Sequence, residues 1–366
     1  MRIHGEHYET IWAKSRSAKT VSVIDQTLLP FDLRIRELHS FDEVFTAIRN
    51  MQVRGAPLIG VTAAYGIWLG LEESPENTDL RTRLGTLCRK MGRARPTAVN
   101  LHRSIHDIQG RLHSVKNITA ARERAFAFAE ELKRSEIGAC RMIGEHGLSL
   151  IRGIAQKKNG PVNILTHCNA GWLACVDWGT AMAPVYLAQR EGIPVHVWVD
   201  ETRPRLQGGK LTAFELREEG VPHTLIADNA GGHLMQHGMV DIVITGSDRT
   251  TVCGDVCNKI GTYLKALAAH DNHIPFYAAL PVSSIDPSLC DGVAGIPIEE
   301  RSGDELIYAE GMQGRVRLFA KGSPAVNYGF DVTPGRLVTG LITQYGICPA
   351  EESAIRELLA GKAAQQ

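Results

Sequence analysis

The chain has 366 residues, of which 44% are apolar and 22% charged, and its 40 basic side chains balance 40 acidic ones. This length predicts two domains, and the composition is that of a globular protein with ample material for a core. The charge balance argues against a nucleic-acid-binding surface, and no apolar run reaches the roughly 20 residues that cross a bilayer.

The N-terminal part predicts a mostly helical domain with a small antiparallel sheet. Residues 1–26 lack the apolar core of a signal peptide, so we expect a cytoplasmic protein. The segments "TVSVIDQTLLP" and "FDLRIREL" predict antiparallel strands. Ser40 and Glu43 then form a capping box at the start of a helix in "FDEVFTAIRNMQV". Further helices are predicted in "PLIGVTAAYGIWLGLEE" and over residues 103–155, and the first domain is predicted to comprise residues 1–158.

Residues 159–366 show a different pattern, in which strands alternate with helices. The predicted strands are "VNILT", "VHVWVDE", "HTLIA", "DIVIT" and "PFYAAL". The predicted helices between and after them are "WGTAMAPVYLAQREG" (from about Trp178), "LTAFELREEG", a short helix, "NKIGTYLKALAAH" and a C-terminal helix with a frayed end. This order predicts an α/β fold with a parallel sheet, in which ligands bind beyond the carboxyl ends of the strands.

Cys168 is the first candidate at such a strand end. It follows "VNILT" within "THCNAG", and a loop cysteine near a helix N-terminus can have a lowered thiol pKa. A buried structural cysteine is the alternative. His167 can perturb the thiol or point into the sheet, because neighbouring strand residues face opposite sides. We interpret Cys168 as functional and His167 as structural.

Asp248 follows the strand "DIVIT" and is the second candidate. A carboxylate at a strand end can act as a general acid or base once burial raises its pKa. The alternative is an ion pair with Arg249 or the capping of a turn.

Several cations stand beside turn residues and predict an anion site. Asn258 and Lys259 are predicted to open a helix, whose N-terminal N–H groups would suit a phosphate. Arg54, in Arg54-Gly55-Ala56-Pro57, and Arg95, in Arg95-Pro96-Thr97, are further candidates. An ordinary helix cap and solvated side chains are the alternative explanation for each.

The eight cysteines are scattered, and we expect most of them to be reduced. Cys253 and Cys257, with His167 and Cys168, make a conceivable zinc site, but the paired spacing of structural zinc sites is missing and we predict no metal. The sequence also lacks the glycine-rich fingerprints of dinucleotide and nucleoside-triphosphate binding.

In this order, "RGAPLIG", "RPTAVNL", "THCNAG", "VWVDETRPRLQG", "GSDR", "GDVCNKIGTY", "PFYAALP", "IPIEER" and "FDVTP" resemble the methylthioribose-1-phosphate isomerases of methionine salvage, from about residue 20 to 347. The resemblance implies a smaller helical N-terminal domain on a Rossmann-like catalytic domain. It also implies a homodimer, a sugar phosphate as substrate, and no metal or organic cofactor.

The same resemblance assigns roles to residues. It implies that Cys168 is the catalytic thiol and Asp248 the general acid. It implies that the substrate is bound by Arg54, Gly55, Ala56, Arg95, Gln207, Asn258 and Lys259. Two departures, Cys253 in place of a common asparagine and the extra residues Val326–Gly329, put the identity of the 5-substituent in question.

The implied reaction converts an aldose 1-phosphate to a ketose 1-phosphate. We expect Asp248 to protonate the ring oxygen, while Cys168 either removes the C2 proton or assists a hydride shift. The rival substrates are 5-deoxyribose 1-phosphate, alone or as a second activity, and ribose 1,5-bisphosphate. A rival class, also within this superfamily, is the non-catalytic regulatory subunit of the translation initiation factor exchange complex, which lacks the thiol and acid pair.

Overall fold

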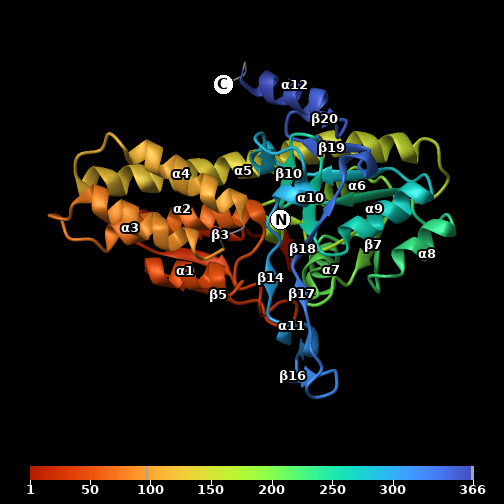
Figure 1. The fold of residues 1–366 in the computed structure, drawn as a ribbon, viewed down its shortest axis with the longest axis horizontal. Helices are drawn as coiled ribbons and strands as arrows, with labels where there is room; N and C mark the ends of the chain where they lie inside the picture. Colours follow the sequence, from red (N-terminus) through yellow and green to blue (C-terminus); the bar gives the residue numbers. More distant parts are fainter. Residues whose placement is uncertain (96–97, 364–366) are drawn as a thin grey trace.

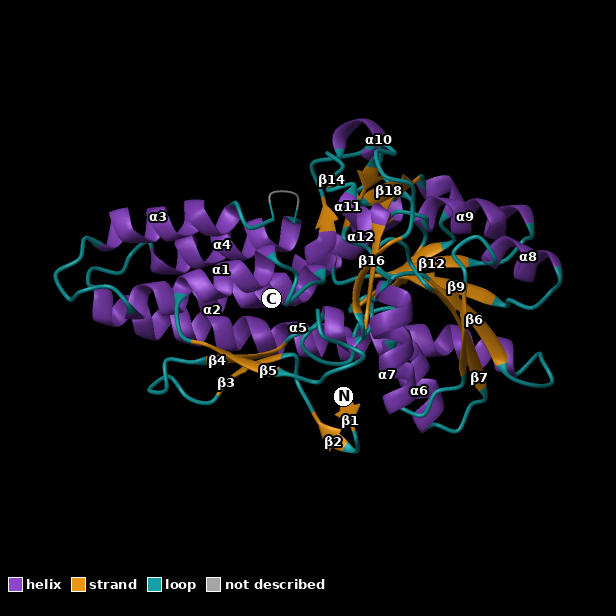
Figure 2. Cartoon of the chain, turned by 90° about the horizontal axis from the view of Figure 1, so that it is seen from below, coloured by secondary structure: helices purple, strands orange, loops and turns teal. Residues whose placement is uncertain are grey.

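The computed structural model describes residues 1–95 and 98–363, so Pro96 and Thr97 of the predicted turn lie outside the described residues. Within these ranges the chain is a mixed α/β fold. Long helices lie at one end of the molecule and a seven-stranded sheet with its helices at the other (Figures 1 and 2). None of the described helices is long and apolar enough to cross a membrane.

The N-terminal part contains two small antiparallel sheets. One is the hairpin of β1 (Arg2–Ile3) and β2 (Glu6–His7), and the other contains β3 (Ile11–Ala13), β4 (Val21–Ile24) and β5 (Ile35–Leu38). The two predicted strands are confirmed as β4 and β5 with shorter bounds, whereas β1, β2 and β3 were not predicted.

The helices that follow are α1 (Phe41–Arg49), α2 (Ala56–Glu72), α3 (Leu80–Gly92), α4 (Val99–Leu112) and α5 (Ile118–Ala155). At α1 the Ser40 side chain accepts a hydrogen bond from the Glu43 N–H, as predicted. The Glu43 carboxylate accepts from the N–H of His39 instead of Ser40. Helix α2 is buried from Pro57 to Leu71, which explains why its sequence is apolar on every face.

The large sheet has the strand order β20-β19-β12-β9-β6-β7-β8. Its members are β6 (Val162–Thr166), β7 (Val195–Asp200), β8 (His223–Ile226), β9 (Ile242–Thr245), β12 (Phe276–Ala279), β19 (Gly340–Thr343) and β20 (Gly346–Cys348). All neighbours are parallel except the β19–β20 pair at the edge. The five predicted strands are confirmed, and β19 and β20 were not predicted.

The strand order reverses at the boundary between β6 and β9. From β6 the chain runs outward to β7 and β8, and then returns to β9, β12 and β19 on the other side. Such a switch point leaves a crevice beyond the carboxyl ends of the two strands, which is where open α/β sheets bind ligands. Cys168 follows β6 and Asp248 follows β9, so both candidates stand at this crevice.

The helices of this part are α6 (Ala183–Arg190), α7 (Ala213–Glu218), α8 (Gly231–Gln236), α9 (Thr262–Asp271) and α12 (Glu352–Ala363), with a π-helical turn, η2 (Gly208–Thr212), before α7. The prediction that a helix starts near Trp178 is wrong, because α6 begins at Ala183. Trp178 and Gly179 have φ angles of 65° and 80°, and this left-handed backbone cannot belong to a right-handed helix.

A second sheet corrects another prediction. It has the order β13-β10-β11-β18 and contains β10 (Arg249–Thr251), β11 (Val256–Lys259), β13 (Ile285–Asp286) and β18 (Phe330–Thr333). Asn258 and Lys259 therefore end a strand instead of opening a helix, because β11 pairs on both sides with β10 and β18. The helix starts only at Thr262, after Gly261 with its φ of 102°.

Short elements join these parts, and those within residues 300–328 form a projecting arm (Figure 1). They are η1 (Trp172–Ala174), η3 (Val282–Ser284), α10 (Gly292–Gly295), β14 (Glu300–Arg301), α11 (Asp304–Ile307), β15 (Tyr308–Gly311), β16 (Gly314–Arg317), β17 (Asn327–Tyr328) and η4 (Gly335–Leu337). Strands β15 and β16 form the hairpin at the tip of the arm. The extra residues Val326–Gly329 include β17, which pairs with β14 at the base of the arm.

Helix α5 joins the two main hydrophobic cores. Its first half contributes Ala121, Ala125 and Phe128 to the core around α2. Its second half contributes Ile143 and Leu148 to the core beneath the large sheet. Helix α5 packs closely against α6, and this packing depends on a glycine. A Cβ at Gly147 would stand 2.5 Å from a Pro184 side-chain carbon.

Candidate active site

A cavity of about 700 Å³ opens beyond the carboxyl ends of β6 and β9. It brings together most of the predicted site residues from five separate parts of the chain. Its polar and charged lining consists of Arg54, Arg95, Cys168, Gln207, Asp248, Arg249 and Lys259. Its apolar lining consists of Met51, Gly55, Ala56, Ile59, Ala98, Cys257, Ile296, Pro297 and Phe330.

The backbone of Cys168 is held in an unusual conformation at the end of β6. Its φ of 65° lies in the left-handed region that residues with a Cβ rarely adopt. The Cys168 N–H donates to the Thr202 hydroxyl over 2.9 Å, and the Cys168 carbonyl accepts from the Thr212 hydroxyl over 2.7 Å. These two bonds fix the turn that directs the thiol into the cavity.

Burial raises the pKa of the Cys168 thiol, and the nearby charges of Arg54 and Lys259 oppose that rise. Asp248 acts in the same direction as burial. The thiol is therefore mostly protonated near neutral pH, in contrast to the lowered pKa that the strand-end position allowed in principle.

His167 is bound to the framework beside the cavity. One ring nitrogen lies 2.8 Å from the Asp200 carboxylate, and the other lies 2.8 Å from the carbonyl oxygen of Ile260. The Lys265 ammonium group lies 3.1 Å from the same Asp200 carboxylate. His167 thus ties β6 to β7 and to the segment before α9, in agreement with the structural interpretation.

Asp248 is the third residue after β9, and its N–H donates to the carbonyl of Cys257 over 3.0 Å. The carboxyl group faces the cavity and is half-buried. Burial raises its pKa, and Lys259, Arg54 and Arg95 limit the rise. Arg249 does not neutralise it, since that guanidinium group pairs with Asp286. The alternative of an Asp248–Arg249 ion pair is therefore wrong.

Lys259 and Asn258 point in different directions, as neighbouring strand residues do. The Lys259 ammonium group lines the cavity, donates to the Gly329 carbonyl over 2.8 Å and lies 4.6 Å from the centre of the Phe330 ring. Burial lowers the pKa of Lys259. Asn258 is not among the cavity-lining residues, and its side chain donates to the Thr262 hydroxyl over 3.1 Å.

The segment Arg54-Gly55-Ala56 brings the N-terminus of α2 to the cavity. Gly55 has a φ of 100°, and a Cβ there would stand 2.2 Å from the Ala174 carbonyl oxygen, so only glycine fits. The first N–H groups of a helix lack partners within it and favour anions. The helix N-terminus at the cavity is therefore that of α2 and not one at Asn258, and Pro57 within its first turn offers no N–H.

Arg95 reaches the cavity from the other side. One of its terminal nitrogens lies 3.1 Å from the Glu299 carboxylate, and both side chains are largely buried. The Nε of Arg95 has no hydrogen-bond partner among the described residues. A buried donor without a partner suits a ligand oxygen.

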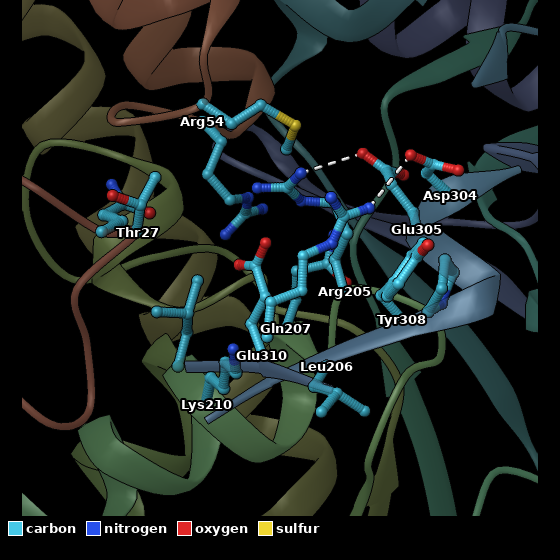
Figure 3. Close-up of a pocket in the computed structure, with 15 residues that line it drawn as sticks. Thr27, Arg54, Arg205, Leu206, Gln207, Lys210, Asp304, Glu305, Tyr308 and Glu310 are labelled. Atoms are coloured by element: carbon cyan, nitrogen blue, oxygen red, sulfur yellow. Dashed lines mark hydrogen bonds and ion pairs between the residues drawn. The ribbon is translucent and has the colours of Figure 1, made fainter. Parts of the chain in front are cut away.

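Gln207 stands between this cavity and a second one of about 810 Å³. The Gln207 side-chain oxygen is buried and has no partner among the described residues. Arg54 and Met51 also line both cavities. The second cavity extends beneath the arm, where Arg205 pairs with Glu305 over 2.9 Å (Figure 3).

Some lining residues were not predicted from the sequence. Ile296, Pro297 and Phe330 form much of the apolar wall, and Glu299 holds Arg95. The stretch "IPIEER", which carries three of them, was noted only as part of the resemblance. A short loop of mixed composition gives no pattern from which its position over the cavity follows.

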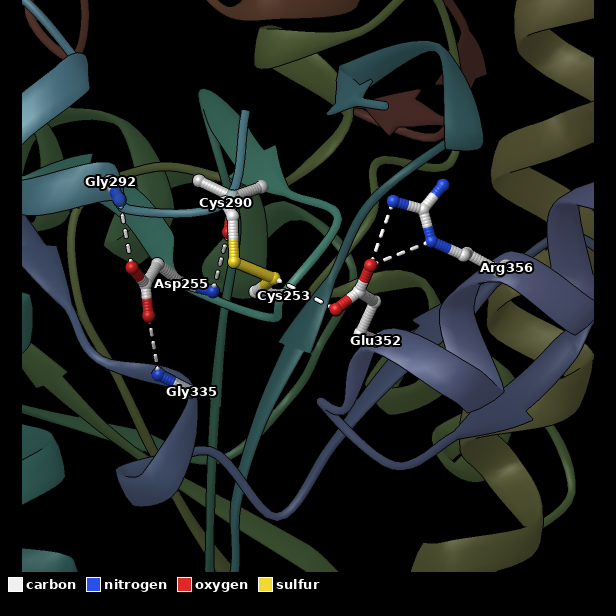
Figure 4. Close-up of a disulfide and its surroundings, with 8 residues drawn as sticks. Cys253, Asp255, Cys290, Gly292, Gly335, Glu352 and Arg356 are labelled. Carbon is white, nitrogen blue, oxygen red and sulfur yellow. Dashed lines mark hydrogen bonds and ion pairs between the residues drawn. A yellow bond between two sulfur atoms is a disulfide. The ribbon is translucent and has the colours of Figure 1, made fainter. Parts of the chain in front are cut away.

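The zinc combination of Cys253, Cys257, His167 and Cys168, which the cysteine spacing does not favour, is not assembled. Cys253 is instead bonded to Cys290 (Figure 4), while the other six cysteines are free, so most cysteines are reduced as expected. Among the described residues, the two groups with metal-ligating geometry are Cys253–Cys290–Glu352 and His167–Asp200–Asp228. The disulfide occupies the sulfurs of the first, and Lys265 neutralises Asp200 in the second.

The chain is similar to proteins of known name. A family model described as the Initiation factor 2 subunit family matches residues 52–350. The methylthioribose-1-phosphate isomerase of Methylorubrum populi is 54% identical over 363 residues, or 98% of each chain. That of Escherichia coli O45:K1 is 53% identical, with 98% of this chain and 97% of that one covered.

Two solved structures share the fold. The 5-methylthioribose 1-phosphate isomerase of Pyrococcus horikoshii has a TM-score of 0.84 and 36% identity, with 97% of each chain covered. The translation initiation factor eIF-2B, subunit delta, of A. fulgidus has a TM-score of 0.80 and 35% identity, with 97% of this chain and 100% of that one covered.

Proposed function

The chain belongs to the Initiation factor 2 subunit family, and we propose that within it the protein is an isomerase that converts 5-methylthioribose 1-phosphate to 5-methylthioribulose 1-phosphate in methionine salvage. The observation that carries this proposal is that Cys168 and Asp248 line one cavity together with the cations Arg54, Arg95 and Lys259. The full-length similarity to proteins named methylthioribose-1-phosphate isomerase supports it.

Ring opening is the first chemical difficulty of the reaction. The anomeric oxygen carries the phosphate, so the sugar cannot open to a free aldehyde, and the ring oxygen needs a proton as its bond to C1 breaks. Asp248 supplies that proton in our proposal. Its raised pKa supports this role, because a partly desolvated carboxyl group keeps its proton at a higher pH than a solvated one.

The second step moves a hydrogen from C2 to C1. Two routes remain: Cys168 removes the C2 proton, or Cys168 assists a direct hydride shift. The raised pKa of the thiol favours the hydride shift, since little thiolate is present at neutral pH. A bound phosphate dianion would raise that pKa further.

Phosphate binding falls to the cations and to the N-terminus of α2. We assign Arg95 and Lys259 as its direct partners, together with the N–H group of Ala56 at the start of α2. Arg54 adds positive charge at the same wall. The unpartnered oxygen of Gln207 suits a sugar hydroxyl, which can donate to it. Asn258 donates to the Thr262 hydroxyl, which donates to the Lys259 carbonyl, so Asn258 would hold the backbone that carries the Lys259 ammonium group.

The rival sugars differ at C5. The apolar wall of Met51, Ile59, Ile296 and Phe330 suits a methylthio group better than the second phosphate of ribose 1,5-bisphosphate. A 5-deoxy sugar lacks only the methylthio group, and apolar pockets discriminate weakly against a smaller substituent. We therefore propose that 5-deoxyribose 1-phosphate is a second substrate.

Turnover of both sugar phosphates, followed by phosphorus NMR, tests the proposed function. We expect ketose 1-phosphate from each, with the larger kcat/KM for the methylthio sugar. If folded protein converts neither sugar, the isomerase proposal fails. A non-catalytic regulatory role would then be preferred, although such a role does not explain why a thiol and a carboxyl group line the same cavity.

The proposal also includes properties that the sequence pattern and the family resemblance imply. These are a homodimer, a cytoplasmic location, the absence of metal and cofactor, and a division into a helical domain of residues 1–158 and a Rossmann-like domain of residues 159–366. Sedimentation velocity at micromolar concentration tests the oligomeric state, and a monomer would contradict it.

A further inference from the structure

Glu215 is a buried acidic residue that the proposed mechanism does not use. It lies on α7 with 0% of its surface exposed. Its carboxylate accepts from the Asn169 side-chain amide (2.9 Å) and from the backbone N–H groups of Leu173 (2.9 Å) and Trp172 (3.0 Å). The Tyr186 hydroxyl donates a fourth bond over 2.6 Å. Burial raises the pKa of Glu215, and these four hydrogen bonds oppose the rise. Three of the donor groups can only donate, so they match an ionised carboxylate.

A buried negative charge needs a nearby positive one. The positive charge here is Arg54, which reaches Glu215 through Asn169. The Arg54 guanidinium group donates to both the side-chain oxygen and the backbone carbonyl of Asn169, the latter over 2.8 Å. Asn169 thus accepts from the cation on one side and donates to the anion on the other.

The loop that carries Cys168 is built around this carboxylate. A Cβ at Gly171 would stand 1.6 Å from a Glu215 oxygen, so the loop passes directly against the carboxylate. Thr212, three residues before Glu215, donates to the Cys168 carbonyl. It also accepts from the Asn169 amide over 3.2 Å.

We propose that Glu215 is a positioning residue of this site: it fixes the loop after Cys168 and, through Asn169, holds the Arg54 guanidinium group at the wall of the cavity. Its effect on turnover rests on the proposed function, whereas its effect on Arg54 and Cys168 does not. Glu215 would affect the reaction through Arg54, because the charge of Arg54 opposes the rise of the Cys168 pKa.

The test is the pH dependence of Cys168 alkylation by iodoacetamide, with the modified peptide identified by mass spectrometry. The charged groups that act on the thiol are Arg54, Lys259 and Asp248. If Arg54 is released, the midpoint of the alkylation profile moves to higher pH, whereas greater accessibility alone changes the plateau rate. We expect an upward shift in Glu215→Ala and a smaller one in Glu215→Gln, which keeps one acceptor oxygen.

The matched control is Tyr186→Phe, which removes one bond to the same carboxylate but leaves Asn169 and Arg54 in place. We expect its alkylation midpoint and its KM to equal those of the wild type. In Glu215→Ala we expect KM for the sugar phosphate to rise about tenfold, because the positive charge of Arg54 is no longer held at the cavity wall.

A folded Glu215→Ala protein with the wild-type midpoint and KM would overturn the proposal. If that variant does not fold, Asn169→Ala serves, because it separates Arg54 from Glu215 and keeps the bonds of the carboxylate to Trp172 and Leu173. An unchanged midpoint in Asn169→Ala would also overturn it. If the wild type converts no sugar phosphate, the proposed function fails, and the alkylation profile still decides the role of Glu215.

Discussion

Asp248 combines a proposed catalytic role with a cost to stability, and both follow from its raised pKa. A carboxyl group whose pKa is higher in the folded state holds its proton more tightly there. Stability therefore falls as pH rises from the ordinary aspartate pKa through the raised one. Above that window the folded protein contains a charge that burial disfavours.

Replacement of Asp248 by asparagine should separate these two effects. We expect kcat to fall by at least about a thousandfold, because the proton donor is lost, while KM stays within about threefold. The melting temperature at neutral pH should rise, since asparagine resembles the neutral carboxyl group. In the wild type, kcat/KM should decline above the raised pKa. Steady-state kinetics against pH and thermal unfolding measure these effects, and substantial turnover by the variant would refute the acid assignment.

The positions of single residues could be predicted where those residues follow a strand, whereas their roles stay predictions. Cys168 and Asp248 could be predicted because each follows a clear apolar strand, and parallel strands end at one edge. The link from Arg54 to Asn169, and through Asn169 to Glu215, could not be predicted, because these two residues lie 115 and 161 positions further along the chain. Glu215 lies in an ordinary helical pattern that looks solvated from the sequence alone.

At the scale of elements, local sequence misled where tertiary pairing decides the structure. "NKIGTYLKALAAH" has the composition of one helix, but its first residues form β11 because β10 and β18 flank them. The disulfide could not be predicted either, since Cys253 and Cys290 are 37 residues apart and meet only because β10 and β13 are neighbours.

The Cys253–Cys290 disulfide joins the turn between β10 and β11 to the loop after β13 (Figure 4). That turn is also held by Asp255, whose carboxylate accepts from the N–H groups of Gly292 and Gly335. The β10–β11 hairpin carries Asp248 next to its first strand and Lys259 at its far end. Because the Asp255 bonds do not involve sulfur, the hairpin should keep its shape without the disulfide.

We therefore expect Cys253→Ser to lose stability and retain activity. A crosslink that closes a loop with a sequence separation of 37 contributes about 4 kcal/mol in the chain-entropy model. Equilibrium urea unfolding should show a loss of about 2–4 kcal/mol, with kcat unchanged. Cys290→Ser is the matched control and should give the same loss, while the double variant adds nothing. Equal stability of wild type and Cys253→Ser would contradict the crosslink.

At the scale of the whole molecule, the predicted boundary near residue 158 separates segments whose side chains share a core. The core beneath the large sheet contains Met1, Ile3, Ile24 and Leu29 from the N-terminus, together with Val162, Ile164 and Ile242 from the strands. The N-terminal ammonium group also pairs with the Asp177 carboxylate. The change of sequence pattern that predicted two domains does not reveal these contacts, because hydrophobic periodicity reports buried faces but not their partners.

The shared core leads us to expect cooperative unfolding of the whole chain. Helix α5 carries apolar residues of both cores along one continuous rod, so loss of the sheet removes the support of its second half. Hydrogen exchange measured by mass spectrometry at increasing denaturant should give the same unfolding free energy for peptides from α2 and from β6. A fragment of residues 1–158 should remain unfolded, because its share of the second core has no partner. If α2 stays protected after β6 exchanges, or if the fragment folds alone, the two parts are independent and α5 does not couple them.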